Sequence, residues 1–333
     1  MTLVKIIIDT DATPTAAVKN LTVDEESAGQ RLDNFLLRHL KGVPKTHVYR
    51  IIRTGEVRIN KGRASADTRV QTGDLVRMPP VRVSTPSPDA PVAPGREFPI
   101  LFEDEQMLAI DKPAGVAVHG GSGVSFGVIE QLRQVRPGAR MLELVHRLDR
   151  DTSGVLLVAK KRSALTRLQD QFRDRETGKT YLALVKGQWP TNKKVIDLPL
   201  QRYLLPSGVG EGERRVRIAH KDDANAQRAI TLVRVARLVG DYSLLEVTIK
   251  TGRTHQIRVH LASQGYPIVG DDKYGDFELN KRMSAQGLKR MFLHAWRLQF
   301  VHPQLGKPQT LQADLPPELQ QFIDHVQPPP APV

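Results

Sequence analysis

A chain of 333 residues is long enough for two domains and a sizeable hydrophobic core. Its 49 Lys and Arg exceed its 36 Asp and Glu, and the resulting net charge of +13 favours a polyanionic partner. The absence of cysteine excludes a disulfide scaffold, an iron–sulfur cluster, a thiol nucleophile and any cysteine-containing zinc site. No apolar run approaches the ~18 residues of a membrane span, and Ile6-Ile7-Ile8 is too short for a signal peptide. A cytoplasmic protein without a membrane partner is expected.

The positive charge is concentrated near the N-terminus. Residues 29–83 contain 12 Lys and Arg against 4 Asp and Glu, a net charge of +8. Seven prolines between Pro79 and Pro99 then indicate a semi-rigid linker, and a second proline cluster begins at Pro328. We therefore predict an extension over 1–28, a basic domain over 29–83, a linker over 84–98, a second domain over 99–326 and a tail over 327–333.

The basic domain has a readable plan. Apolar residues at helical spacing predict a helix over 32–40, and a second helix is expected from Pro44 to Gly55. A short strand over 57–59, a turn at Asn60-Lys61-Gly62 and a strand over 75–78 complete a hairpin. This plan resembles the α-L, or S-four-like, RNA-binding domain. An amphipathic two-helix cap with a solvated basic face is the alternative. The expected phosphate-binding residues are Arg31, Lys45, Arg50, Arg53, Arg58, Lys61 and Arg63.

A polar loop over residues 146–154 carries the strongest chemical signal in the second domain. It lies between the apolar segment 141–145 and a predicted strand over 155–159. Arg147 and Arg150 flank Asp149 and would keep its carboxylate ionised. An ionised carboxylate in a sheltered loop can act as a nucleophile or a base. The alternative is a salt-bridged loop that holds two strands in register.

A second signal follows about 100 residues later. Leu245, Val247 and Ile249 alternate as a strand, and a helix is expected to begin after Thr254 as its N-cap. Arg253, His255 and Arg258 would then gather at the start of that helix, a position that attracts anions. A purely structural phosphate or carboxylate contact is the alternative.

Two glycine-containing stretches fail as nucleotide sites. Gly178-Lys179-Thr180 lacks the glycine that a phosphate loop needs five residues earlier, where Arg173 stands. The run His119–Gly123 has no lysine and the wrong glycine spacing. We expect both to be turns or loops near an active site. His255 and His260 are five residues apart and lack a completing carboxylate, so no metal site is expected.

Both signals occur, in the same order, in a known family. Together with Asp111-Lys112-Pro113-Ala114-Gly115 and the run 179–185, they resemble the RluA-type pseudouridine synthases from about residue 100 to about residue 325. The resemblance implies an α+β fold, with a mixed, largely antiparallel sheet, flanking helices and a central basic cleft. It also implies isomerisation of uridines in 23S ribosomal RNA, with no cofactor and no protein partner. A non-catalytic ribosomal RNA-binding assembly factor is the alternative.

The resemblance also implies roles for individual residues. Asp149 matches the catalytic aspartate, which could attack the anomeric carbon, remove the ribose 2′ proton to give a glycal, or add to carbon 6 of uracil. Arg258 matches its arginine partner, and Tyr181 the tyrosine that stacks on uracil and could remove the final proton. Arg147 matches the arginine that fills the space of the flipped-out base.

Three further positions belong to the expected substrate site. Ile257 would line the uracil pocket, His255 lies beside it, and Lys112 would support the loop beneath it. The chain departs from the family at one place, where Ala226-Gln227 replaces a Gly-Lys pair after a charged, irregular stretch over 211–224. That departure puts a local turn, and an RNA contact there, in question. A monomer is expected.

Overall fold

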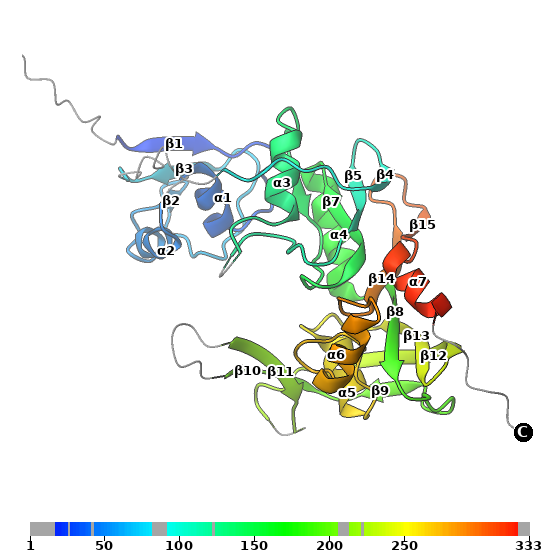
Figure 1. Ribbon diagram of the computed structural model, residues 1–333. Coiled ribbons are helices and arrows are strands. Elements are labelled where there is room, and N and C mark those ends of the chain that lie inside the picture. Colours follow the sequence, from blue (N-terminus) through cyan, green and yellow to red (C-terminus); the bar gives the residue numbers. More distant parts are fainter. Residues whose placement is uncertain are drawn as a thin grey trace, which may run out of the picture. The chain divides into compact units, whose positions relative to one another are not determined.

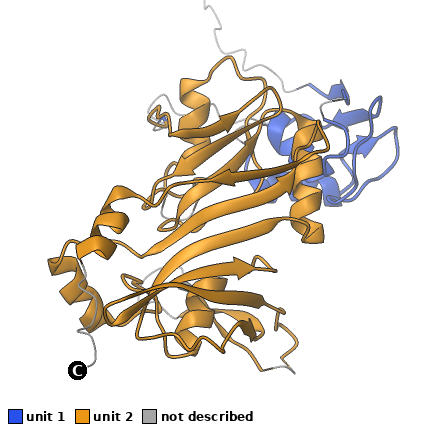
Figure 2. Cartoon of the chain, turned by 90° about the vertical axis from the view of Figure 1, so that its right-hand side faces the viewer, with its two compact units in different colours: residues 1–92 blue, residues 93–333 orange. Residues whose placement is uncertain are grey.

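The computed structural model describes residues 17–25, 27–40, 43–81, 92–121, 124–205, 213–220 and 223–325. The chain divides into two compact units, Met1–Val92 and Ala93–Val333 (Figure 2). Most of the predicted extension and linker, and the whole predicted tail, lie outside the described residues. Within the described ranges, no helix is long and apolar enough to cross a membrane.

The first unit packs two short helices on a small sheet (Figure 1). Its elements are β1 (Lys19–Thr22), α1 (Leu32–His39), α2 (Lys45–Arg53), β2 (Arg58–Ile59) and β3 (Leu75–Met78). The sheet order is β1-β3-β2, and both pairings are antiparallel. Phe35 and Leu36 of α1 pack with Val48 and Ile51 of α2 in one buried cluster, as their helical spacing predicts. Strand β1 was not foreseen, because four residues carry too little periodicity.

The second unit is built on one ten-stranded mixed sheet, as the α+β prediction requires. Its main path is β4-β5-β7-β14-β8-β13-β12-β9, while β6 pairs with β7 and β15 with β14. In the described ranges β14 and β7 are parallel and the other pairings of this sheet are antiparallel. The strands are β4 (Ile100–Glu103), β5 (Met107–Lys112), β6 (Glu143–Leu144), β7 (Ser153–Ala159), β8 (Gly178–Lys186), β9 (Val195–Asp197), β12 (Ile230–Val239), β13 (Tyr242–Ile249), β14 (Leu293–Val301) and β15 (Pro308–Gln312).

Two helices cover opposite faces of β5 and β7. Side chains alternate between the faces of a strand, so Leu156 and Leu157 point to opposite sides. Leu156 packs in one cluster with Leu132 of α3 (Val128–Val135), and Leu157 in another with Leu168 of α4 (Arg162–Asp174). This two-sided burial explains why all seven residues of β7 are buried.

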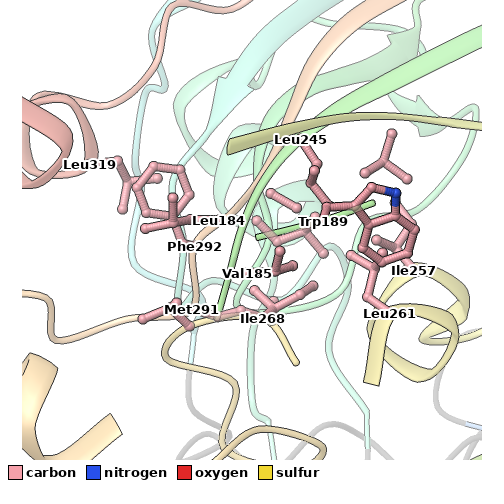
Figure 3. Packing of buried hydrophobic residues seen from close by; sticks show 14 of the residues in the cluster. Leu184, Val185, Trp189, Leu245, Ile257, Leu261, Ile268, Met291, Phe292 and Leu319 are labelled. Atoms are coloured by element: carbon pink, nitrogen blue, oxygen red, sulfur yellow. The ribbon is translucent and has the colours of Figure 1, made fainter. Parts of the chain in front are cut away.

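A further core cluster lies under the other half of the sheet (Figure 3). Leu245 on β13 and Leu184 on β8 pack with Ile257 and Leu261 of α5 (Gln256–Ser263). The helices α6 (Phe277–Ala285) and α7 (Pro317–His325) contribute Leu279 and Leu319 to the same cluster. This packing fixes α5 against the sheet next to the end of β13.

Two expectations about local structure are wrong. The stretch predicted to be irregular contains β11 (Glu213–Ile218), which pairs antiparallel with β10 (Leu200–Leu205). A turn forms at 223–226, and Gln227 after it forms two backbone hydrogen bonds with Leu200. The turn therefore forms although Ala226-Gln227 replaces the Gly-Lys pair. Gly178-Lys179-Thr180 lies at the beginning of β8 rather than in a turn, because the run continues into β-forming residues that pair with β13 and β14.

Candidate active site

The loop that carries Asp149 connects β6 to β7 in the second unit. Gly154, the second residue of β7, has a φ of 112°, and a Cβ there would lie 2.2 Å from the carbonyl oxygen of Ala295 on β14. A glycine is therefore required for β7 and β14 to approach closely, which explains the glycine at the end of the aspartate loop.

Helix α5 supplies the opposite wall of the site. Its N-cap is His255 in the left-handed conformation (φ 51°), not Thr254 as predicted. The side-chain amide of Gln256 holds the loop before the helix: its oxygen accepts from the backbone N–H of Arg253, and its nitrogen donates to the carbonyl of Ile230. The hydroxyl of Thr254 instead accepts a hydrogen bond from Arg202 on β10.

These elements enclose a cavity of about 150 Å³. The adjacency of β7, β14, β8 and β13 brings the aspartate loop, the middle of β8 and the beginning of α5 together. Six of the seven residues expected at the catalytic and substrate site line this cavity: Arg147, Asp149, Tyr181, His255, Ile257 and Arg258. Segments more than 100 residues apart in the chain thus meet at one cavity.

Arg258 contacts three carboxylates at this site: those of Asp149, Asp271 and Asp272. Its Nη1 is 3.7 Å from Oδ2 of Asp149, while Nε and Nη2 each donate to Asp271 at 2.7 Å. The side chains of Arg258 and Asp271 are 2% and 1% exposed, so this is a buried bidentate pair. Burial opposes ionisation of Asp271, but its pair with Arg258 lowers the pKa of the carboxyl group.

Asp271 was missed in the sequence, and the predicted partners of Asp149 need correction. Asp271 stands in the run Gly270-Asp271-Asp272, which directly follows the buried Ile268 and Val269, and this was the available signal. Arg150 pairs with Asp151 at 3.1 Å and not with Asp149. Arg147 is exposed at the rim of the cavity. The groups that do approach Asp149 are the Arg258 guanidinium and the His255 imidazole, at the beginning of α5.

Tyr181 and Ile257 give the cavity its apolar surface. Tyr181 points from β8 opposite Val247 of β13, and it packs against the core clusters on both sides. Burial, and secondarily the negative charge of Asp149, raise the pKa of the Tyr181 phenol, which is therefore protonated at neutral pH. A neutral aromatic ring beside a carboxylate and a half-buried imidazole suits a flat, uncharged ring as ligand.

Lys112 does not line this cavity. Its side chain is fully buried, and its ammonium donates to the carbonyl oxygens of Pro113, Val116 and Arg150 at 2.8, 2.8 and 3.0 Å. It lies beside a separate cavity of about 610 Å³ on the other side of residues 150–153. Its hydrogen bond to the Arg150 carbonyl ties the Lys112 side chain to the aspartate loop.

The seven expected RNA-binding residues all belong to the first unit. Lys45, Arg50, Arg53, Lys61 and Arg63 are exposed. Arg58 is half-buried on β2, and Arg31 forms a bidentate pair with Asp33 while 45% of its side-chain surface stays exposed. Six of the seven side chains are therefore exposed on the surface of this unit.

Comparisons with known proteins agree with both regions. A family model described as RNA pseudouridylate synthase matches residues 106–263, and a model of the S4 domain matches residues 30–76. The chain is 51% identical to ribosomal large subunit pseudouridine synthase C of Pasteurella multocida, over 92% of this chain and 93% of that protein. The chain belongs to the RNA pseudouridylate synthases.

Further relatives support the same family. The synthase is 48% identical to ribosomal large subunit pseudouridine synthase C of Escherichia coli over 91% of its length and 95% of that protein. The solved structure of human RNA Pseudouridylate Synthase Domain Containing 4 matches with a TM-score of 0.54 and 26% identity, covering 69% of this chain and 94% of the human chain. The predicted fold, family and pseudouridine synthase activity are confirmed, which favours the enzyme over the non-catalytic alternative. Within the described residues, no group of three His, Asp or Glu side chains could hold a metal ion.

Proposed function

We propose that this synthase isomerises specific uridines in the 23S RNA of the large ribosomal subunit, with Asp149 as the reacting carboxylate on a flipped-out uridine. The main support for this proposal is that Asp149, Arg258 and Tyr181 line the same cavity. The names of the relatives at 48–51% identity support the ribosomal substrate. The exposed cations of the S4 domain provide a surface for RNA phosphates.

Asp149 is suited to the chemistry by its position. Its side chain is 21% exposed, so it reaches the cavity, and the Arg258 guanidinium on its other side compensates its charge. The carboxylate can attack the anomeric carbon as the bond from ribose to uracil nitrogen breaks. It can instead take the ribose 2′ proton, leaving a glycal, or add to carbon 6 of the ring. In each route the uracil is then rejoined to ribose through its carbon 5.

Tyr181 and Arg147 complete the proposed substrate site. The Tyr181 ring would stack on the uracil, and Ile257 would pack against its edge. Because its pKa is raised, the Tyr181 phenol could take the proton from carbon 5 only after losing its own. Arg147, exposed at the rim, would occupy the space that the flipped base leaves in the RNA.

The test is a chemical map of pseudouridine in 23S RNA from cells that lack the synthase, complemented with wild type, Asp149→Asn or the surface control Asp174→Asn. Asp174 is an exposed carboxylate at the end of α4. We expect the marks to disappear on deletion and to return with wild type and Asp174→Asn. Purified Asp149→Asn should lose at least about a thousand-fold in rate. Marks that persist on deletion would refute the substrate, and marks restored by Asp149→Asn would refute the role of the carboxylate.

A further inference from the structure

Tyr274 lies in the segment between Asp271, the partner of Arg258, and helix α6. Its side chain contacts two residues that line the active-site cavity, His255 and Arg258. Its hydroxyl is 2.8 Å from Nδ1 of His255 and accepts a hydrogen bond of 3.0 Å from the backbone N–H of Val216 on β11. Its ring lies 5.2 Å from the guanidinium of Arg258 and 5.5 Å from the His255 ring. One side chain therefore touches strand β11, His255 and Arg258.

The proton positions of the Tyr274 hydroxyl and the His255 imidazole follow from counting their hydrogen-bond donors and acceptors. A phenol has one proton to donate, and the Val216 N–H already occupies one of its acceptor sites. Within the described part of the chain, His255 Nδ1 is the acceptor that lies at hydrogen-bond distance from this hydroxyl. If the phenol donates to Nδ1, the neutral imidazole must carry its own proton on Nε2. That Nε2 is the atom that faces Asp149, 4.0 Å from Oδ2.

We propose that Tyr274 is a positioning residue that fixes His255 as the Nε2–H tautomer, so that a neutral N–H donor is aimed at the Asp149 carboxylate. The proposal rests on the role of Asp149 proposed above. The distance of 4.0 Å is longer than a hydrogen bond, and we expect it to shorten when the substrate is bound, as catalytic hydrogen bonds are often long in a free enzyme. The opposite tautomer would point a lone pair at the carboxylate and repel it.

The charge state of His255 agrees with this arrangement. Burial lowers the pKa of His255, although Asp149 and Asp271 oppose the shift, and Arg258 and Lys273 reinforce it. A donated hydrogen bond from Tyr274 to Nδ1 stabilises the neutral imidazole in the same direction. A neutral donor can orient Oδ2 of Asp149 without adding a second full positive charge to that of Arg258, which would weaken the carboxylate as a nucleophile or base.

Tyr274 also ties the β10–β11 hairpin to the site. Beside the Val216 contact, Arg215 of β11 donates to the carbonyl of Lys273 at 3.0 Å. Arg202 of β10 lines the cavity and donates to Thr254, the residue before His255. The hairpin therefore braces the N-terminal end of α5 at two points, and the Tyr274 hydroxyl is the one that reaches the imidazole.

The deciding experiment is Tyr274→Phe in the full-length enzyme, with Tyr266→Phe as the matched control. Phe keeps the ring beside Arg258 and removes only the hydroxyl, whereas the Tyr266 ring packs at a tilt against Trp189 and does not line the cavity. The ¹⁵N spectrum of the imidazoles reports the tautomer, and the His255 signal is assigned by its absence in His255→Asn. We expect the Nε2–H tautomer in wild type and Tyr266→Phe, and a mixture in Tyr274→Phe.

Kinetics on an RNA substrate provide the second readout. We expect kcat of Tyr274→Phe to fall roughly ten-fold with little change in KM, and the acid limb of the pH profile to move to higher pH as the His255 pKa rises. An Nδ1–H tautomer in wild type, or unchanged tautomer and kcat in Tyr274→Phe, would overturn the proposal. The tautomer is read without turnover, so an active Asp149→Asn enzyme would refute the role of Asp149 separately.

Discussion

The two units each contain a bidentate Arg–Asp pair, and the pairs differ in exposure. In the S4 domain, Arg31 donates to both oxygens of Asp33, and the side chains are 45% and 4% exposed. In the catalytic unit, Arg258 holds Asp271 in the same fork, with 2% and 1% exposed. The half-exposed guanidinium keeps a surface that can face an RNA phosphate, whereas the buried one is used to arrange carboxylates.

The comparison shows that an Arg–Asp pair suits different tasks when it is buried and when it is exposed. A buried ion pair is costly to desolvate and costly to break, so it holds its members in one geometry. Arg258 is thereby fixed at a set position beside Asp149. An exposed pair contributes little to stability and remains free to exchange partners when a polyanion approaches.

Removal of the buried carboxylate should produce the largest effect on stability. Asp271→Asn leaves the Arg258 guanidinium buried with one strong partner lost, and we expect the free energy of unfolding to fall by about 3–5 kcal/mol. Activity should fall with it, because Arg258 is then free to turn toward Asp149. Urea denaturation followed by circular dichroism measures the first effect.

The adjacent residue provides a matched control for this change. Asp272 also accepts from Arg258, at 3.2 Å, but its side chain is 59% exposed. Asp272→Asn should therefore cost less than about 1 kcal/mol. Equal losses for the two variants would show that burial does not distinguish the two contacts, and the contrast drawn between the exposed and buried pairs would be wrong.

The parts of the fold and site that could be predicted from the sequence are those set by residues close together in the chain. Helices α1 and α2 followed from apolar spacing, and β13 from its alternation, because burial of one face imposes these periods. The aspartate loop and the beginning of α5 were found because their polar residues are contiguous. Their meeting at one cavity was expected from the family resemblance, since no local pattern gives a contact between residues 149 and 258.

Three of the misses involve contacts between residues that are distant in the chain. Thr254 has a residue type that favours the N-cap position, but His255 occupies it. The loop is held instead by a hydrogen bond from the Gln256 side chain to the carbonyl of Ile230, 26 residues away. Strand β11 is rich in charge, and only its pairing with β10 reveals it. Asp271 and Tyr274 act on Arg258 and His255 across a turn whose course the sequence does not specify.

Lys112 is a buried cation whose ammonium is held by three backbone carbonyls instead of the carboxylate that holds Arg258. Burial lowers the pKa of Lys112 to about 7, although its three carbonyl partners match the three donors of an ammonium. Between this pKa and the ordinary value of 10.5, the unfolded chain binds the proton that the folded protein releases. The Lys112 contribution should therefore make stability rise as the pH rises through this window, by up to about 1.4 kcal/mol per pH unit.

The measurement compares wild type with Lys112→Met, which keeps the length of the side chain and removes the charge. Unfolding free energies between about pH 7.5 and 9.5 should rise less steeply in the variant. Parallel pH profiles would mean that the three carbonyl hydrogen bonds hold the Lys112 pKa near its ordinary value.

The smallest expected effect concerns a single exposed cation of the S4 domain. Arg53 is exposed in the last turn of α2, so Arg53→Gln should leave stability unchanged. If it neutralises one RNA phosphate, the variant should bind 23S RNA a few-fold more weakly, and the slope of log affinity against log salt should fall by about one. Arg96→Gln, an exposed arginine beside Phe98 in the catalytic unit, is the control for loss of charge alone. The slope is the decisive quantity, because a cation that contacts no phosphate releases no counterions: an unchanged slope in Arg53→Gln would place this residue outside the RNA-binding surface.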